Sequence, residues 1–317
     1  MYKFDPEVIQ LGISSCVLGE AVRFDGGHRR SAFCTDVLAE YVRFVPICPE
    51  MAIGLGKPRP SIRLQRKDQD VVAITSKGDD VTAALREFGQ QSASRHGYLS
   101  GYILCGKSPS CGMERVRVYD AVGSCNVKEG VGVYTAELMK ANPLMPLEEN
   151  GRLNDMTLRE NFITRVYAYH DWLSLVHKGL SASDLIDFHS RYKFLLLAHS
   201  PRVYYQLGPL LANLSEDLEA TAEHYIHAFM GALKQVATRK RQCNVLQHIQ
   251  GFFKDKLSTT QRQELARVIE NYRQGMLPLL APLTLINHFL NEYPNAYIRQ
   301  QRYLNPYPET LALRYAI

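Results

Sequence analysis

The sequence predicts two domains: an N-terminal α/β domain built on a parallel sheet, and an all-α C-terminal domain. The chain has 317 residues, more than a single small core requires. Up to about residue 140, short β-branched runs alternate with helix-like segments, whereas from about Thr157 to Tyr303 apolar residues recur with a period of 3.6. Between them, residues 140–155 contain two prolines and a glycine. We therefore expect domains at residues 1–150 and 151–317.

The parallel sheet is predicted from three segments that each run from a strand into a turn. They are VIQLGISS, RFVPICPE and YLSGYILCGKSPSCG. The segments CTDVLAEYV and DDVTAALREFGQQSASRHG between them have helical spacing, and a further strand is expected around Val116–Tyr119. Strands separated by helices favour parallel pairing. In such sheets the ligand site lies beyond the carboxyl ends of the strands.

Composition indicates an ordinary globular protein that is kept in a reducing compartment. The chain is 46% hydrophobic and 22% charged, and it has no apolar run of about 18 residues, so no membrane span is expected. The first 15 residues lack the apolar core of a signal peptide, which predicts a cytoplasmic location. Thiols stay reduced there, so seven cysteines indicate free thiols, metal ligands or catalysis instead of disulfides.

Three cysteines, Cys16, Cys48 and Cys111, are each expected directly after one of these strands. They form no CxxC pair, and neither zinc-finger spacing nor a tight ferredoxin run is present. Thiolates are the ligands of iron–sulfur clusters, and three of them would leave one iron of a 4Fe-4S cluster open to a substrate. The alternative for each cysteine is a small buried hydrophobe. Cys34 is expected in the core, and Cys105 is expected to point into the sheet.

Three motifs in order, SSCVLGEAVRFDGGHR, CPEMAIGLGKPRP and GKSPSCG, resemble the thiouracil desulfidase (TudS) family over residues 8–150. The second half, through FHSRYKFLLLAHSPRVYYQLG and TRKRQCNVLQHIQGFFKDKLS, resembles the helical domain of YbgA-like proteins. Together the two halves look like a tRNA thiouridine desulfidase. The resemblance implies a 4Fe-4S cluster on Cys16, Cys48 and Cys111, with one iron lacking a protein ligand. That iron would bind the thiocarbonyl sulfur, and water would replace sulfur without net redox change.

Further site residues are predicted around these motifs, and for each the alternative is a purely structural role in a turn or cap. Glu50 follows Cys48 by two residues and is the candidate general base. The serines of KSPSCG and its backbone amides offer hydrogen-bond donors, and its lysine offers a positive charge for the heterocycle. The predicted catalytic residues are Glu50, Ser108 and Lys107, and the predicted substrate-binding residues are Arg23, Asp25, Arg59 and Ser110.

The helical half carries a concentration of positive charge. Between Tyr225 and Gln263 there are seven Lys or Arg side chains against Asp255 alone. Such a run is either a solvated helix face or a surface for phosphates. In the second case the RNA backbone is held here while a splayed base enters the catalytic pocket. The predicted RNA-binding residues are Lys193, His199, Arg239, Lys240, Arg241 and Lys254.

Three functions compete at this point. The favoured one is a desulfidase acting on thiouridine in tRNA, with 4-thiouridine preferred over 2-thiouridine. The second is the same chemistry on free thiouracil, with the helical domain serving oligomerisation. The third is a non-catalytic RNA- or partner-binding protein whose cluster is structural or sensory.

Overall fold

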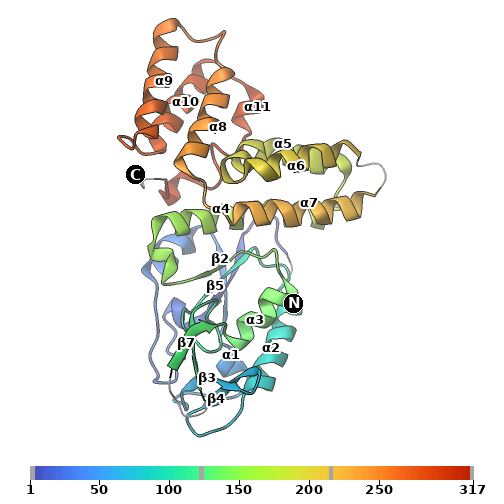
Figure 1. The fold of residues 1–317 in the computed structure, drawn as a ribbon, viewed down its shortest axis with the longest axis vertical. Coiled ribbons are helices and arrows are strands. Elements are labelled where there is room, and N and C mark those ends of the chain that lie inside the picture. Colours follow the sequence, from blue (N-terminus) through green and yellow to red (C-terminus); the bar gives the residue numbers. More distant parts are fainter. Residues whose placement is uncertain (1–3, 121–124, 214–216, 315–317) are drawn as a thin grey trace. The chain divides into compact units, whose positions relative to one another are not determined.

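The computed structural model describes residues 4–120, 125–213 and 217–314. The chain divides into two compact units: Met1–Asp155 with Tyr169–Ser174, and Met156–Ala168 with Leu175–Ile317. The first unit contains all strands found in the described residues, and the second is built from helices (Figure 1). The predicted fold class, α/β followed by all-α, is therefore confirmed.

A four-stranded parallel sheet forms the centre of the first unit. Its strands are β1 (Gln10–Ser14), β2 (Arg43–Ile47), β5 (Gly101–Leu104) and β8 (Leu147–Glu149), in the order β2-β1-β5-β8. All five residues of β1 are buried, as expected for a central strand. Gly12 in β1 lies against the ring of Tyr102 in β5, where a Cβ atom would collide with the ring. A residue without a side chain is therefore required for these strands to pack.

A second sheet, which the sequence analysis did not predict as a sheet, lies in the same unit. Its strands are β3 (Ile62–Lys67), β4 (Asp70–Thr75), β6 (Val116–Tyr119) and β7 (Cys125–Gly130), in the order β4-β3-β6-β7. Strands β3 and β6 are parallel, and the two outer pairs are antiparallel. The strand expected at 116–119 is confirmed. Strands β3 and β7 were missed because charged and polar residues interrupt their apolar positions, so neither has a continuous apolar run. Strand β4 has such a run, Val71–Ile74, but the sequence analysis did not assign it.

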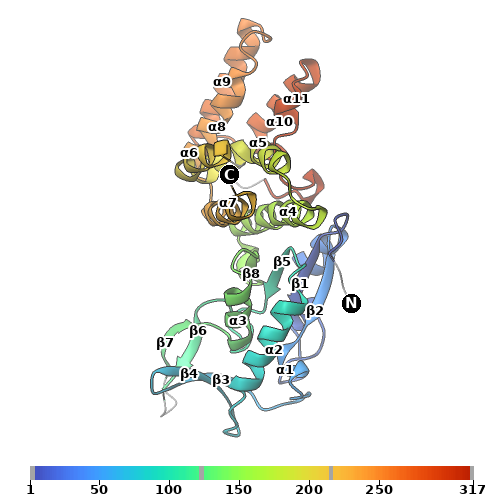
Figure 2. The same ribbon diagram turned by 90° about the vertical axis from the view of Figure 1, so that its right-hand side faces the viewer.

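Among the described residues, three α-helices lie wholly within the first unit. Helix α1 (Pro49–Ala52) is short, whereas α2 (Thr82–Arg95) and α3 (Val133–Ala141) lie side by side (Figures 1 and 2). The helix predicted at 34–42 is instead a π-helical turn, Phe33–Val37, followed by a 3-10 turn, Leu38–Glu40. The backbone of Val37, with φ −121° and ψ −62°, departs from α-helical geometry between the two turns.

The helices of the second unit follow one another with short connections. Serine caps with reciprocal hydrogen bonds begin two of them, at Ser181 and Ser258, and Thr238 caps a third. Within the described ranges, no helix has the length and apolar character needed to cross a membrane. The helices are α4 (Met156–Lys178), α5 (Ala182–His199), α6 (Pro201–Leu210), α7 (Leu218–Leu233), α8 (Arg239–Gly251), α9 (Thr259–Arg273), α10 (Leu280–Glu292) and α11 (Ala296–Arg299).

Candidate active site

A cavity of about 660 Å³ lies at the carboxyl ends of the parallel strands. Residues at the ends of all four strands line it: Ser14 of β1, Ile47 of β2, Cys105 after β5 and Glu149 of β8. This is the position that parallel pairing predicts for a ligand site. Its volume is within the usual range for small-molecule pockets.

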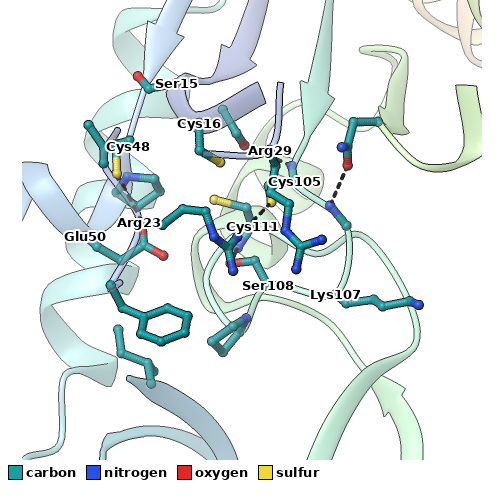
Figure 3. Close-up of a pocket in the computed structure, with 18 of the residues that line it drawn as sticks. Ser15, Cys16, Arg23, Arg29, Cys48, Glu50, Cys105, Lys107, Ser108 and Cys111 are labelled. Carbon is teal, nitrogen blue, oxygen red and sulfur yellow. Dashed lines mark hydrogen bonds between the residues drawn. The ribbon is translucent and has the colours of Figure 1, made fainter. Parts of the chain in front are cut away.

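Four thiols, and not three, line this cavity (Figure 3). Cys16 lies in a 3-10 turn after β1, and Cys48 directly follows β2 and caps α1. Directly after β5 comes Cys105, whereas Cys111 lies seven residues beyond that strand. The expectation that Cys111 follows a strand directly is therefore wrong. So is the expectation that Cys105 points into the sheet, because its Sγ accepts a hydrogen bond from Arg23 Nη1 at 3.8 Å. Cys34, by contrast, is fully buried in the core as predicted.

The turn between Cys105 and Cys111 is held by its own serine and by α3. Ser108 Oγ accepts hydrogen bonds from the backbone N–H groups of Ser110 and Cys111, at 3.2 and 3.1 Å. The carbonyl of Ser110 accepts from the first turn of α3, with Tyr134 N at 3.1 Å. At Gly132, just before α3, any Cβ atom would collide with the Ser110 backbone. Hydroxyls and glycines in this segment thus fix the position of the Cys111 thiol.

The thiols have perturbed pKa values. A hydrogen bond from Cys16 to Cys105, together with burial, raises the pKa of Cys16. The same bond and the neighbouring Arg23 lower the pKa of Cys105, so negative charge in this pair is favoured on Cys105. Burial and the nearby Glu50 carboxylate raise the pKa of Cys48 to about 11. Burial also raises the pKa of Cys111. Binding of any metal group by Cys16, Cys48 and Cys111 must therefore release protons.

The donor set suits an iron–sulfur cluster better than a single ion. Among the described residues, no three His, Cys, Asp or Glu side chains converge closely enough to hold one metal ion. The four sulfurs are instead distributed around one cavity (Figure 3). A cluster of four irons is larger than one ion, so the thiolates at its corners stand farther apart. Hydrogen bonds to the sulfurs are also present, from Arg23 to Cys105 and from Ser14 to Cys111.

Glu50 lies in the first turn of α1 and faces the cavity. Its Oε2 accepts a hydrogen bond from the Cys48 thiol at 3.3 Å and lies 3.7 Å from Arg59 Nη2. The Arg59 side chain is only 5% exposed, and its Nη1 donates to the carbonyls of Val22 and Gly56, at 2.8 and 2.9 Å. Arg59 therefore lines the cavity, and its contacts position Glu50 and a neighbouring loop.

The other predicted pocket residues divide into two groups. Arg23, Lys107 and Ser108 line the cavity. Asp25 does not: its side chain is 53% exposed and accepts a hydrogen bond from Gly27 N within its own turn. Ser110 is fully buried, and its hydroxyl lies outside the cavity lining. Both predictions are wrong, because in each case the neighbouring residue of the motif carries the side chain that faces the cavity.

Several lining residues were missed by the sequence analysis. Phe24 and Arg29 belong to the motif SSCVLGEAVRFDGGHR, which also contains Arg23, so the sequence offered a signal for them. Glu149 and Arg152 had none, because they lie in the predicted domain boundary. Glu149 Oε1 accepts from Met113 N at 2.8 Å, and Arg152 pairs with Glu114 at 2.7 Å. Among the residues that the structure describes, six cations and three carboxylates line the cavity: Arg23, Arg29, Arg59, Lys107, Arg115 and Arg152 against Glu50, Glu114 and Glu149.

In the second unit, half of the predicted RNA-binding residues have internal partners. His199 is buried, and its Nδ1 bonds to the carbonyl of Gln235 at 2.6 Å. Arg241 Nη1 donates to the His199 carbonyl at 2.6 Å, and Arg239 Nη1 donates to the Tyr272 carbonyl at 3.0 Å. These three do not form a free phosphate-binding face. Lys240 and Lys254 are exposed, and Lys193 Nζ lies 5.5 Å from the centre of the Phe194 ring.

Comparison with known proteins places both halves in families. The family model described as 2-thiouracil desulfurase matches residues 11–150, and one described as a protein of unknown function (DUF1722) matches residues 193–308. The uncharacterized protein YbgA of Escherichia coli (strain K12) is 38% identical over 167 residues, which are 52% of this chain and 96% of YbgA. The chain belongs to the YbgA family and carries an N-terminal 2-thiouracil desulfurase domain.

A solved structure, the [4Fe-4S]-dependent thiouracil desulfidase TudS, is also similar to this chain. It is 28% identical, with a TM-score of 0.39, and the match covers 48% of this chain and 97% of that structure. The family memberships confirm the resemblance inferred from the motifs. In this desulfurase domain the motif cysteines, Glu50 and Arg59 all line one cavity.

Proposed function

We propose that the chain is a desulfidase that replaces the sulfur of a thiolated uracil base by oxygen, and that its substrate is thiouridine in tRNA, with 4-thiouridine favoured. The net reaction converts C=S and water into C=O and hydrogen sulfide, with no change of oxidation state. The observation that supports it most is the convergence of the motif cysteines and Glu50 in one cavity of the 2-thiouracil desulfurase domain.

Cys16, Cys48 and Cys111 are the residues that would hold a 4Fe-4S cluster in this cavity. When bound, the cluster would supply an iron without a protein ligand, a soft acceptor for the substrate sulfur. Cys105 is the fourth sulfur of the cavity, and its contact with Arg23 keeps it beside the ligand set.

Glu50 is the proposed general base. Its carboxylate takes a proton from the attacking water, and its position is fixed by Arg59 at 3.7 Å. Arg59 Nη1 donates to two backbone carbonyls, which holds in place the guanidinium group that faces Glu50. Arg59 is thus a positioning residue for the base.

Cations and the aromatic ring of Phe24, which line the cavity, would bind the substrate. Phe24, which is 43% exposed, offers a face on which a pyrimidine can stack. Arg23, Arg29 and Lys107 also line the cavity and supply positive charge to it (Figure 3). The excess of cations over carboxylates attracts an anionic substrate, as a nucleotide within RNA is.

The helical unit supports a polynucleotide substrate through one feature. A hollow beside the first turn of α8 is lined by Arg239, Lys240, Arg241 and Arg273. Their charges favour an anion there, although two of the guanidinium groups already bind carbonyls. A domain that holds the tRNA backbone leaves the base free to enter the cavity.

The proposal is tested by anaerobic purification, quantification of iron and sulfide, and incubation with 2-thiouracil and with thiolated tRNA, followed by nucleoside analysis. Conversion of 4-thiouridine to uridine in tRNA, with release of sulfide, is the expected result. Turnover of 2-thiouracil alone would favour the free base as substrate. A stable cluster with neither activity would contradict the proposal and favour a structural or sensory role.

A further inference from the structure

A row of three cations crosses the second sheet of the desulfurase domain. Arg117 of β6 is paired with Lys128 of β7. On the other side of β6, Leu64 of β3 is paired with Val118, so Arg63 stands beside Arg117 one residue earlier. All three cations are exposed, whereas Leu64, Val116 and Val118 alternate with them and are buried on the opposite face. Three adjacent strands therefore present one positive side chain each on the solvent face.

The row has no carboxylate partner in the described ranges. No ion pair involves Arg63, Arg117 or Lys128 there, whereas the neighbouring Arg66 is paired with Glu129. Like charges that face each other across strands destabilise a sheet. An anion bound over the row would relieve this repulsion.

The row lines a groove of about 530 Å³ that adjoins the catalytic cavity. Groove and cavity share four lining residues, Ile62, Lys107, Pro109 and Arg115. Two of the shared residues are cations, and the Arg115 side chain is 77% exposed. Positive charge thus continues from the cavity mouth onto the sheet.

An aromatic ring lies within the same groove. Tyr119 of β6 lines it, and the Arg63 guanidinium carbon is 5.8 Å from the centre of the Tyr119 ring. Cations that alternate with an aromatic face are typical of surfaces that bind single-stranded nucleic acid, where phosphates meet the cations and a base stacks on the ring. The adjacent strands are about 4.8 Å apart, so the row spans roughly 10 Å.

We infer that this groove binds the sugar–phosphate backbone of RNA next to the nucleotide whose base enters the cavity. The inference rests on the proposed function and extends it, because it assigns RNA contacts to the desulfurase domain itself. A base inside the cavity leaves its flanking phosphates at the cavity mouth, and the groove begins there at Lys107 and Arg115. The groove would bind consecutive phosphodiester groups, without base-specific contacts.

The test is a salt titration of tRNA binding by the full-length chain. Replacement of the row, R63Q/R117Q/K128Q, removes up to three phosphate contacts, so the slope of log K against log salt should become shallower by roughly 2 to 3. The matched control, K67Q/K77Q/R86Q, removes three exposed cations of the same domain and should leave the slope unchanged. Two of them, Lys67 and Arg86, lie near the Asp80 carboxylate and lower its pKa. R63K/R117K keeps the charge and should keep the slope.

Turnover of 2-thiouracil and of thiolated tRNA tests the proposed function separately from this inference. The row variant should process 2-thiouracil at the wild-type rate and thiolated tRNA with a lower kcat/KM. Inactivity of the wild-type protein on both substrates would contradict the proposed function, while the salt slope would still report on the groove. An unchanged slope in R63Q/R117Q/K128Q, or an equal loss in the control, overturns the inference and indicates that the row serves another anion, such as an acidic protein.

Discussion

Replacement of Glu50 by glutamine removes a proton acceptor and little else. Glutamine has nearly the same size, and its amide oxygen can still face Arg59. The other carboxylates of the cavity cannot easily substitute, because Glu114 is paired with Arg152 and Glu149 accepts from Met113 N. Loss of a general base lowers kcat by about 100-fold or more. A factor of 100 corresponds to about 2.7 kcal/mol in the barrier.

The assay is anaerobic turnover of 2-thiouracil, with uracil and sulfide quantified and with iron content matched between proteins. The Glu50→Gln protein should retain its iron and its KM and lose kcat by the factor above. Asp25→Asn is the matched control, because Asp25 is also a carboxylate of the family motifs but does not line the cavity, and its side chain, 3.9 Å from Arg23 Nε, is 53% exposed. It should stay within about twofold of wild type. A Glu50→Gln rate near wild type at neutral pH would refute the assignment and indicate that another group activates the water.

Three further predictions concern the thiols and the helical unit. Alanine at Cys16, Cys48 or Cys111 should abolish the cluster absorbance, whereas Cys34→Ala should retain it. If the absorbance survives in Cys111→Ala but is lost in Cys105→Ala, Cys105 is the ligand in place of Cys111. Burial lowers the pKa of His199 from 6.5 to about 4 in the folded chain. Between pH 6.5 and 4 the unfolded chain therefore binds a proton at His199 that the folded chain does not bind. The unfolding free energy should therefore fall by about 3 kcal/mol as pH drops from 6.5 to 4. In urea titrations at the two pH values, His199→Gln should not show this part of the decrease. Arg241→Gln leaves the His199 carbonyl without its donor and should lower the unfolding free energy by about 1 to 3 kcal/mol, whereas Lys240→Gln should change it by less than about 0.5 kcal/mol; equal effects would contradict the assigned contacts.

Local sequence determined the parts of this protein that depend on short-range patterns. Alternation of strands and helices before residue 140, and the helical period after Thr157, predicted the α/β and all-α halves that the structure shows. The motifs around Cys16, Cys48 and Cys111 predicted the family and the edge of the sheet at which the site lies. Both follow from chain segments of fewer than about 20 residues.

Contacts between distant segments decided the rest. Whether Cys105 faces the cavity or the sheet depends on Ser14, 91 residues earlier, whose Oγ accepts from Cys105 N at 3.0 Å. The internal partners of Arg239 and Arg241 lie 33 and 42 residues away, so a run of cations that looks free in the sequence is partly used. Likewise, the positive row exists only because the register of β3, β6 and β7 brings Arg63, Arg117 and Lys128 side by side. Register and side-chain direction are set by non-local pairing, which a linear pattern does not encode.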